Sequence, residues 1–358
     1  MTRITRRAAL TAAAASALAA PSIARAQTPM QWRMVTSWPR NLPGPGVSAQ
    51  RLADRITTMS HGRIEIKLYA ADEIVPAFGV MDAVGSDTAQ IGHTAAVFWM
   101  GKIKASAFFL AMPYGLTPLE HNSWIEQGGG QELWDALYAD LGVKPFMAGN
   151  TGMSMGGWFK DELRSKADLN GLKFRMPGLG GEMYAGMGIV QVSIPPGQIL
   201  PELQKGTIDA AEFAGPSSDL ALALFRAAPY YYWPGLHEPN GTGECLINRP
   251  VWEGLDSTLK TVIVNACAAE NAAALAEAEM RNAEALRVLV EDHSVQLRQF
   301  PSDIEEAARP VARDVLAQFK SRGGLDAQIH DSYVAMLERE RRWSNVSVRA
   351  FLDARDRG

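Results

Sequence analysis

The chain of 358 residues has only two cysteines and six histidines, and neither set forms a recognisable metal site. The histidines make no His-Glu-x-x-His run, and the cysteines lack the spacing of a zinc site. The glycine-rich stretch at residues 178–181 has neither the Walker lysine nor the dinucleotide-binding pattern. No group of residues requires catalysis. We therefore expect a protein that is not an enzyme and has no catalytic cofactor.

The first 26 residues have the composition of an export signal. Arg3, Arg6 and Arg7 precede an apolar, alanine-rich run at residues 8–20, and residues 24–26 supply the small side chains that a signal peptidase reads. The two adjacent arginines further indicate the twin-arginine type. Because the apolar run is shorter than the roughly 20 residues that cross a bilayer, a retained anchor is the minor alternative. We expect residues 1–26 to be removed on export to the periplasm.

Little basic charge remains after that removal. The signal holds four arginines and no acid, so 31 basic and 39 acidic residues are left, a formal net charge of about −8. No basic stripe is present, which makes nucleic acid an improbable partner. The remaining 332 residues are many for one core and suit two lobes. In an oxidising compartment Cys245 and Cys267 could form one disulfide, or they could be small residues of the core, and the sequence leaves both alternatives open.

The hydrophobic periodicity predicts an α/β protein with open sheets flanked by helices. Strands and helices alternate at the start of the exported chain, and such a β-α-β-α-β run builds an open sheet with helices on both faces. We expect lobe I to contain residues 27–148 and about 234–256. Its predicted strands are residues 31–37, 63–69 and 89–92, and its predicted helices are residues 47–60 and 78–84.

Residues 149–233, with parts of the C-terminal helices, are expected to form lobe II. Short apolar runs separated by turn residues predict its strands, and the bulky run 230–235 is interpreted as a strand that crosses back to lobe I. Strands are expected at residues 156–159, 172–175, 190–192 and 209–213, and helices at residues 181–187 and 199–205.

Two helical regions follow. Residues 257–296 are almost free of glycine and proline and rich in alanine, leucine and glutamate, which predicts one helix of about 60 Å. Such a helix exceeds either lobe, so it must run along both lobes or reach a second subunit. A final helix is expected at residues 325–353, with the charged run 338–342 on a solvated face.

Arg175 is the first candidate for the functional site. It ends a short apolar run, and Met176-Pro177-Gly178 prevents the strand from continuing. Arg175 therefore belongs at the carboxyl end of a strand, where open α/β sheets present their ligand crevices. A buried guanidinium needs an anionic partner. That partner is either a ligand carboxylate or an internal acid such as Glu212 or Glu238, and the pattern leaves both open.

Three motifs carry a family resemblance: residues 169–178 (LNGLKFRMPG), residues 203–212 (LQKGTIDAAE) and residues 233–239 (WPGLHEP). With them the exported chain resembles the extracytoplasmic substrate-binding proteins of TRAP transporters, which are tripartite ATP-independent periplasmic transporters. Within that family it resembles the 2-oxo-acid-binding branch. The resemblance implies a two-lobed, periplasmic-binding-protein-like receptor that closes on an organic acid and delivers it to membrane permease subunits. It also implies a homodimer through the long helix.

The resemblance also assigns roles to single residues. Arg175 matches the arginine that holds the substrate carboxylate, which the fork of a guanidinium does better than lysine. Glu212 and the main-chain carbonyl of Phe213 match the position of a bridging cation, and an all-oxygen shell suits Na⁺ or Ca²⁺. Glu238 matches a further ligand contact. Weaker ligand candidates are Trp99, as an aromatic wall of lobe I, and Asn150.

Three departures from the branch affect the ligand. Ser154 is a further candidate ligand contact, because it stands where a glutamine normally contacts cation and ligand. Phe213 and Ser217 each replace a tryptophan. The shorter groups enlarge the pocket and weaken the cation shell. The primary expectation is a 2-oxo acid such as pyruvate, held with or without a cation. The first alternative is the same receptor class binding a bulkier or cyclic acid such as pyroglutamate without a cation. The rival function class is an exported enzyme acting on small acids, and a third class is a receptor linked to a signalling kinase.

Overall fold

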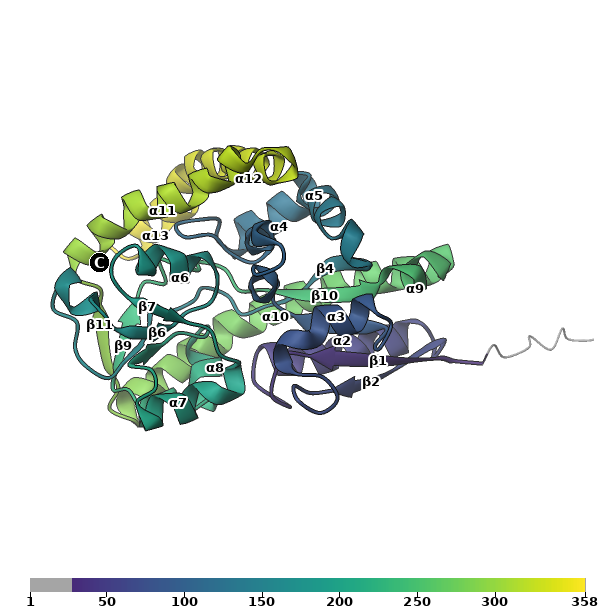
Figure 1. The fold of residues 1–358 in the computed structure, drawn as a ribbon, viewed down its shortest axis with the longest axis horizontal. Helices are drawn as coiled ribbons and strands as arrows, with labels where there is room; N and C mark the ends of the chain where they lie inside the picture. Colours follow the sequence, from purple (N-terminus) through teal and green to yellow (C-terminus); the bar gives the residue numbers. More distant parts are fainter. Residues whose placement is uncertain (1–27, 358) are drawn as a thin grey trace, which may run out of the picture.

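The structure is a computed structural model that describes residues 28–357 (Figure 1). The predicted signal at residues 1–26 lies outside the described residues. Lobe I contains a five-stranded sheet in the order β2-β1-β3-β10-β4. The first three strands are parallel, whereas β10 is antiparallel to both of its neighbours. The strands are β1 (Met30–Thr36), β2 (Ile64–Tyr69), β3 (Ile91–Thr94), β4 (Val143–Asn150) and β10 (Thr242–Asn248).

The helices of lobe I begin where the sequence supplies capping groups. Thr117 and Glu120 form a capping box at the start of α4, and Pro45 occupies the first turn of α2. The core behind the sheet includes Phe109, whose ring stacks between two tryptophans. The helices are α2 (Pro45–Met59), α3 (Val80–Gly85), α4 (Pro118–Gln127), α5 (Gly130–Leu137) and α9 (Arg249–Gly254), with 3₁₀ turns η2 (Ala77–Gly79), η3 (Ala96–Trp99), η4 (Lys104–Phe109) and η5 (Ala139–Leu141).

Lobe II contains a six-stranded sheet in the order β11-β9-β5-β8-β6-β7. The strands β6, β7 and β8 are parallel, so their carboxyl ends lie at one edge. The strands are β5 (Gly157–Phe159), β6 (Lys173–Arg175), β7 (Val190–Val192), β8 (Ala210–Ala211), β9 (Tyr230–Trp233) and β11 (Gln296–Gln299). The helices are α6 (Gly178–Ala185), α7 (Ile199–Lys205) and α8 (Pro216–Ala221), with turns η6 (Lys166–Leu169), η7 (Pro196–Gln198) and η8 (Leu224–Arg226).

The chain passes between the lobes at residues 151–156 and 234–241. The interpretation of residues 230–235 as a strand that returns to lobe I is wrong. Residues 230–233 form β9, which pairs with β5 and β11 inside lobe II. The strand that returns to lobe I is β10, for which the sequence analysis made no prediction. It inserts between β3 and β4 and closes the sheet of lobe I.

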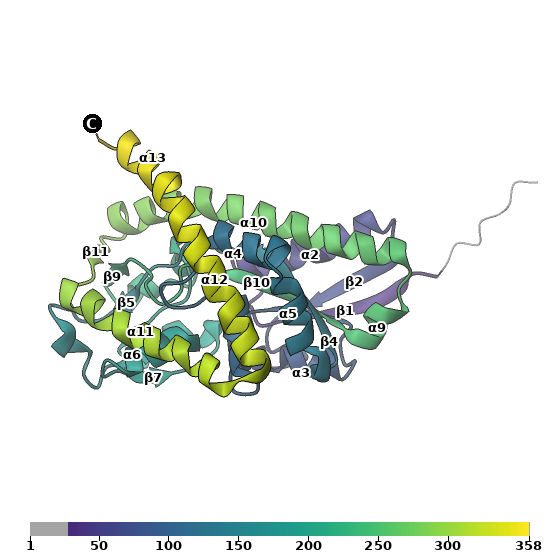
Figure 2. The same cartoon turned by 90° about the horizontal axis from the view of Figure 1, so that it is seen from above.

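The long helix α10 (Ser257–Glu291) runs along both lobes (Figures 1 and 2). Asp256 caps its first turn, and it packs against α2 and β4 of lobe I and α8 of lobe II. The predicted end at residue 296 is wrong. The chain turns at Ser294, which has φ 57°, and residues 296–299 then pair with β9. Pairing with a strand distant in sequence overrides the local helical preference.

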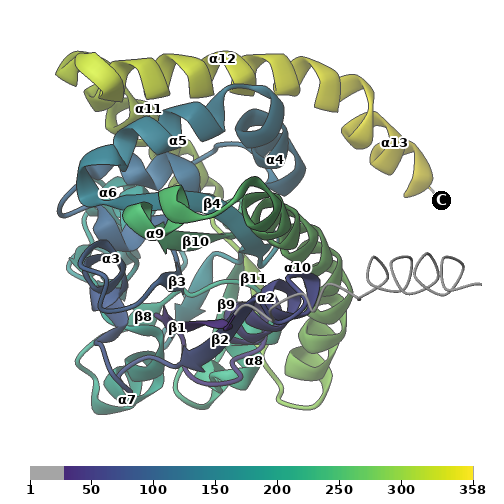
Figure 3. The same ribbon diagram turned by 90° about the vertical axis from the view of Figure 1, so that its right-hand side faces the viewer.

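Three further helices complete the chain: α11 (Ser302–Arg322), α12 (Gly324–Val346) and α13 (Val348–Arg355). Helix α11 packs against α6 of lobe II, and α12 packs against α4 and α5 of lobe I. The single helix predicted at residues 325–353 is divided at Ser347, where ψ is −98°. Helix α13 buries no residue and extends beyond the two lobes (Figures 2 and 3).

The two cysteines are both free, buried thiols in the structure. Of the two alternatives that the sequence left open, the structure therefore has the small core residues and not the disulfide. Cys245 on β10 and Cys267 on α10 are buried against each other in the core of lobe I. The hydrogen bond with Cys267 and burial both raise the pKa of the Cys245 thiol. Within residues 28–357, every helix is too short or too polar to cross a membrane.

Candidate functional site

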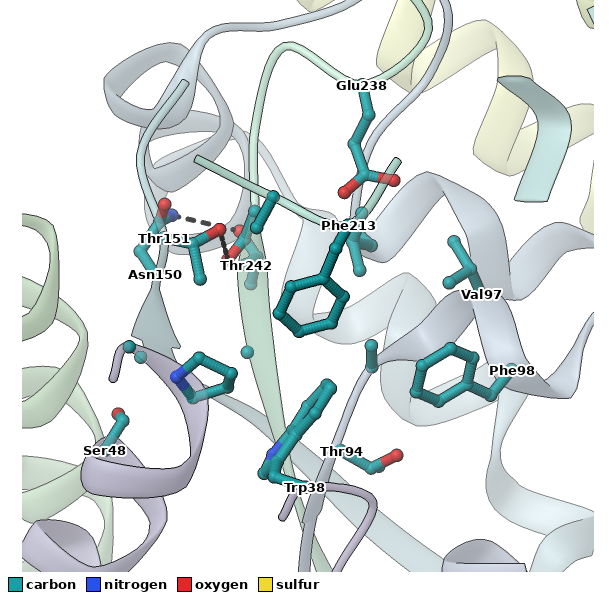
Figure 4. Close-up of a pocket in the computed structure, with 18 of the residues that line it drawn as sticks. Trp38, Ser48, Thr94, Val97, Phe98, Asn150, Thr151, Phe213, Glu238 and Thr242 are labelled. Carbon is teal, nitrogen blue, oxygen red and sulfur yellow. Dashed lines mark hydrogen bonds between the residues drawn. The ribbon is translucent and has the colours of Figure 1, made fainter. Parts of the chain in front are cut away.

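A cavity lies between the two lobes, where the carboxyl ends of the parallel strands face each other (Figure 4). Its open space is about 590 Å³ with the mouth included, which is in the range of small-molecule sites. Lobe I contributes an apolar wall, and lobe II contributes charged groups. The residues that carry the argument below are Trp38, Val97, Phe98, Asn150, Arg175, Glu212, Phe213 and Glu238.

Arg175 is at the end of β6 and is only 1% exposed. Its Nη1 donates to Glu212 Oε1 at 2.9 Å and to the Glu212 main-chain carbonyl, and its Nε donates to the carbonyl of Ile194 at 3.2 Å. Within the described residues its Nη2 donates no hydrogen bond. The sequence left open whether the partner of Arg175 is an internal acid or a ligand. In the structure Arg175 is paired with the internal acid Glu212 and also lines the cavity.

Glu212 follows β8 and is 2% exposed. Its Oε1 accepts from Arg175, and its Oε2 is 3.2 Å from His237 Nε2. Burial raises the pKa of the Glu212 carboxyl, but the His237 hydrogen bond and the Arg175 charge outweigh burial and lower the pKa overall. Glu212 is therefore ionised, and two partners fix the direction of its carboxylate.

Glu238 lines the cavity beside this pair and is partly buried. Burial raises its pKa well above the usual range, the charge of Glu212 raises it further, and Arg175 only partly opposes the effect. Glu212, His237 and Glu238 each offer one ligand atom within 4.8 Å of the others. Two carboxyl groups thus lie beside one arginine, and the raised pKa of Glu238 means that its proton is held more tightly than that of an ordinary carboxyl.

Asn150, which the sequence analysis named as a weaker ligand candidate, is the last residue of β4 and lines the cavity. Its amide nitrogen donates to Asn240 Oδ1 at 2.9 Å, and its oxygen accepts from the Gly152 N–H at 2.8 Å. Asn240 in turn donates to Thr242 Oγ1. These bonds fix the Asn150 side chain at the point where the chain leaves lobe I.

Two predicted site residues do not line the cavity. Trp99 is 3% exposed, and its indole Nε1 donates to Glu244 Oε2 at 2.8 Å inside the core of lobe I. In a 3₁₀ turn successive side chains point about 120° apart, and in η3 it is Phe98 that faces the cavity. The assignment of Trp99 as the aromatic wall is therefore wrong.

Ser154 is buried in the segment between β4 and β5, and its Oγ has no hydrogen-bond partner in the described residues. It stands in a Gly-x-Ser-x-Gly run at residues 152–156. The run lies between two strands rather than at a strand-to-helix turn, and no base contacts the hydroxyl. The local structure therefore supports neither direct ligand contact nor a hydrolase nucleophile.

The sequence analysis missed His237, Trp38 and Phe98. Trp38 comes shortly after β1, so the rule that selected Arg175 at a strand's carboxyl end would also have selected Trp38. His237 contacts Glu212 from the segment between β9 and β10, and only the three-dimensional arrangement shows that contact. Its Nδ1 is buried and has no hydrogen-bond partner in the described residues.

Comparison with known proteins supports a single assignment. Residues 36–322 match the family described as bacterial extracellular solute-binding protein, family 7 (DctP). The monocarboxylate 2-oxoacid-binding periplasmic protein of Nostoc sp. strain PCC 7120 is 36% identical over 318 residues, which cover 89% of this chain and 87% of the relative.

Solved structures agree with that match. A TRAP transporter solute-binding protein of Bordetella bronchiseptica, a dimer with copurified calcium and picolinate at one active site, has a TM-score of 0.89 and 34% identity over 92% of this chain and 97% of its own. A TRAP periplasmic solute-binding protein of Colwellia psychrerythraea with bound calcium and pyruvate has a TM-score of 0.88 and 34% identity, covering 91% of this chain and 100% of its own. A Bordetella pertussis receptor that binds pyroglutamic acid is 17% identical over 85% of this chain and 99% of its own, with a TM-score of 0.75, and supports the fold alone.

Proposed function

We propose that this chain, which belongs to family 7 of the bacterial extracellular solute-binding proteins, is the periplasmic receptor of a TRAP transporter for a small 2-oxo monocarboxylate. One observation carries the ligand assignment. Arg175 is buried at the edge of the cavity, and among residues 28–357 its Nη2 has no hydrogen-bond acceptor. The solute receptors of this family bind rather than transform their ligands, so the alternative of an exported enzyme has no support.

Binding of the carboxylate follows from the geometry of Arg175. Its Nη1 and Nε groups are held by acceptors in lobe II, and these bonds orient the guanidinium plane. A ligand carboxylate that reaches Nη2 gains a charge-assisted hydrogen bond in a site from which water is largely excluded. Contacts from lobe I to the rest of the ligand would then favour the closed arrangement of the two lobes.

A cation suits the donor set of the site. Glu212 is ionised and Glu238 lies beside it, where burial and the charge of Glu212 raise the pKa of Glu238. Na⁺ or Ca²⁺ prefers such carboxylate oxygens, and the carbonyl of Phe213 would add another. Bound there, the cation would neutralise the second carboxylate and polarise the 2-oxo group of the ligand. Ser154 is not among the residues that line the cavity, so the direct role that the family resemblance implied for it is not part of this proposal.

Isothermal titration calorimetry tests the ligand and the cation together. Pyruvate, 2-oxobutanoate and pyroglutamate are titrated in sodium-free choline buffer, with added Na⁺, with added Ca²⁺ or with chelator. We expect the two 2-oxo acids to bind more tightly when a cation is present, and to be recovered unchanged by mass spectrometry. Tighter binding of pyroglutamate, or formation of a product, contradicts the proposal. Unaltered pyruvate binding by the Glu212→Ala variant contradicts the cation role.

Export through residues 1–26 is part of the same proposal. The paired Arg6 and Arg7 indicate the twin-arginine route. Replacing both arginines by lysine is expected to retain the precursor in the cytoplasm, as fractionation and immunoblotting of the producing bacterium would show. Export of the double variant at the normal level would favour an ordinary secretory signal instead.

We also propose a homodimer, which the sequence placed at residues 257–296. One side of α10 is buried against both lobes. A second exposed surface is on α12 and α13, where Trp343, Val346, Val348 and Phe351 are each more than half exposed. Apolar side chains gathered on projecting helices suit burial against a second copy. One similar structure, that of the Bordetella bronchiseptica protein, is a dimer.

A further inference from the structure

An aromatic wall closes one side of the cavity. The ring centroids of Trp38 and Phe98 are 5.9 Å apart, and those of Trp38 and Phe213 are 6.4 Å apart. The three rings come from the segment after β1, from η3 and from the segment after β8, so the wall spans both lobes (Figure 4). Val97 and Leu110 extend the same apolar surface.

The polar groups in this wall are already used inside the protein. Trp38 Nε1 donates to His93 Nδ1 at 2.8 Å, and burial lowers the pKa of His93 to about 4, so that its ring is neutral and donates from Nε2 to the Ala148 carbonyl. Ser48 Oγ donates to Glu270 Oε1 at 2.7 Å. Ser37 donates to a main-chain carbonyl, and the Thr94 hydroxyl bonds to Ser37 at 2.6 Å. The wall therefore offers no uncommitted donor to a polar ligand group.

The charges of the cavity exclude a second acidic group. Among the described residues that line it, Arg175 is the only lysine or arginine, and Glu212 and Glu238 are its acids. A ligand with two carboxylates would place the second one without a cationic partner or beside these acids. Removing such a charge from water without a partner is strongly unfavourable.

Phe213 connects the carboxylate site to the wall. The centre of the Arg175 guanidinium is 5.9 Å from the centroid of the Phe213 ring, whose other neighbour is Trp38. A carboxylate on Arg175 thus directs the rest of the ligand along Phe213 toward Trp38 and Phe98. We propose that Trp38, Phe98 and Phe213 form a side-chain pocket that selects 2-oxo monocarboxylates with an apolar side chain larger than the methyl group of pyruvate. This inference rests on the proposed function for the position of the carboxylate.

The test is a calorimetric series in which only the side chain of the ligand changes. Pyruvate, 3-methyl-2-oxobutanoate, 4-methyl-2-oxopentanoate and 2-oxoglutarate are titrated at one pH and one cation concentration. We expect affinity to rise by roughly tenfold for each methyl group that enters the pocket. We expect 2-oxoglutarate to bind at least roughly tenfold more weakly than pyruvate, because its second carboxylate loses water without gaining a partner.

Two variants connect the selectivity to the wall. Phe98→Ala and Phe213→Leu are expected to reduce the ratio of the 4-methyl-2-oxopentanoate affinity to the pyruvate affinity by roughly tenfold each. Phe213→Leu retains the main-chain carbonyl. Leu119→Ala, on an exposed residue of α4, is the matched control and should leave the ratio unchanged. Thermal unfolding shows whether each variant is folded.

The outcomes separate this inference from the proposed function. If no 2-oxo acid binds, the proposed function fails. If pyruvate binds but the larger side chains give equal or weaker affinity, only the side-chain pocket is wrong. A ratio that is the same in the folded wild type and in both wall variants also overturns the pocket.

Discussion

Arg175 and Glu212 face each other at 2.9 Å from the ends of two neighbouring parallel strands, β6 and β8. The pair is nearly excluded from solvent, so each charge depends on the other for its stability in the fold. The same pair forms the base of the cavity. One ion pair therefore both stabilises the edge of the sheet in lobe II and presents a guanidinium to the ligand.

Replacing Arg175 by lysine is expected to weaken binding of 2-oxo acids by roughly a hundredfold, about 3 kcal/mol, because lysine lacks the fork that bonds Glu212 and ligand together. Arg175→Ala is expected to destabilise the fold by roughly 3 kcal/mol or more, since it leaves the buried Glu212 unpaired. Calorimetry measures the first effect and urea unfolding the second. The exposed Arg164→Lys is the control. Normal affinity in a folded Arg175→Lys protein would contradict the clamp.

Cation binding is expected to release a proton. Burial and the charge of Glu212 raise the pKa of Glu238 well above its usual range, so the free site holds a proton there. A cation that joins Glu238 must displace this proton, and cation affinity should therefore rise with pH. Calorimetry in phosphate and in Tris, whose ionisation enthalpies differ, counts the protons. Glu238→Gln should abolish the release, and equal heats in both buffers for the wild type would contradict the expectation.

Glu244 is expected to make the fold less stable as the pH rises. Burial raises its pKa to about 7, while in the unfolded chain it ionises near its ordinary value of 4.5. Between these values the folded protein holds more protons than the unfolded chain, so the free energy of unfolding falls by on the order of 3 kcal/mol from pH 4.5 to pH 8. Glu244→Gln removes this contribution, whereas Glu126→Gln on the surface should not. Urea unfolding of the three proteins at pH 5 and pH 8 measures it.

The fold of the site could be predicted in part from local pattern. The runs at residues 172–175 and 209–213 both become strands, and the stop at Pro177 places Arg175 at an edge. Their adjacency in the sheet, which brings Glu212 to Arg175, depends on a non-local strand order that no short pattern contains. The insertion of β10 between β3 and β4 is non-local for the same reason.

The errors at single residues have different causes. A tryptophan in an apolar run gives no sign of which way a 3₁₀ turn will direct it, so Trp99 was chosen although Phe98 lines the cavity. The family position of Ser154 indicated a contact, but Ser154 is buried between β4 and β5 and does not line the cavity. The contact between His237 and Glu212 joins segments 25 residues apart, which only the fold brings together.

Ligand affinity should depend on an ion pair that joins the lobes outside the cavity. Lys104 of η4 in lobe I contacts Glu182 of α6 in lobe II at 2.8 Å, and both side chains are partly exposed. Lys104→Glu is expected to weaken ligand binding about two- to fivefold, because it favours the open arrangement. Adding Glu182→Lys should restore the affinity. The control is Lys102→Glu, because the partner of Lys102, Asp82, is in the same lobe. A double variant Lys104→Glu/Glu182→Lys that binds the ligand still more weakly would contradict the role of this ion pair.

Dimer formation is expected to depend on the projecting helices α12 and α13. Phe351 is 65% exposed on α13, where no residue is buried within its own chain, so Phe351→Asp should weaken self-association by at least roughly tenfold through the loss of apolar burial. Met280→Asp, at a 78% exposed position of α10, tests the long helix in the same way. Sedimentation velocity over a range of concentrations measures both. If only Met280→Asp dissociates the dimer, the interface is on α10 and not on α12 and α13. If the wild type is a monomer, neither surface forms a dimer interface.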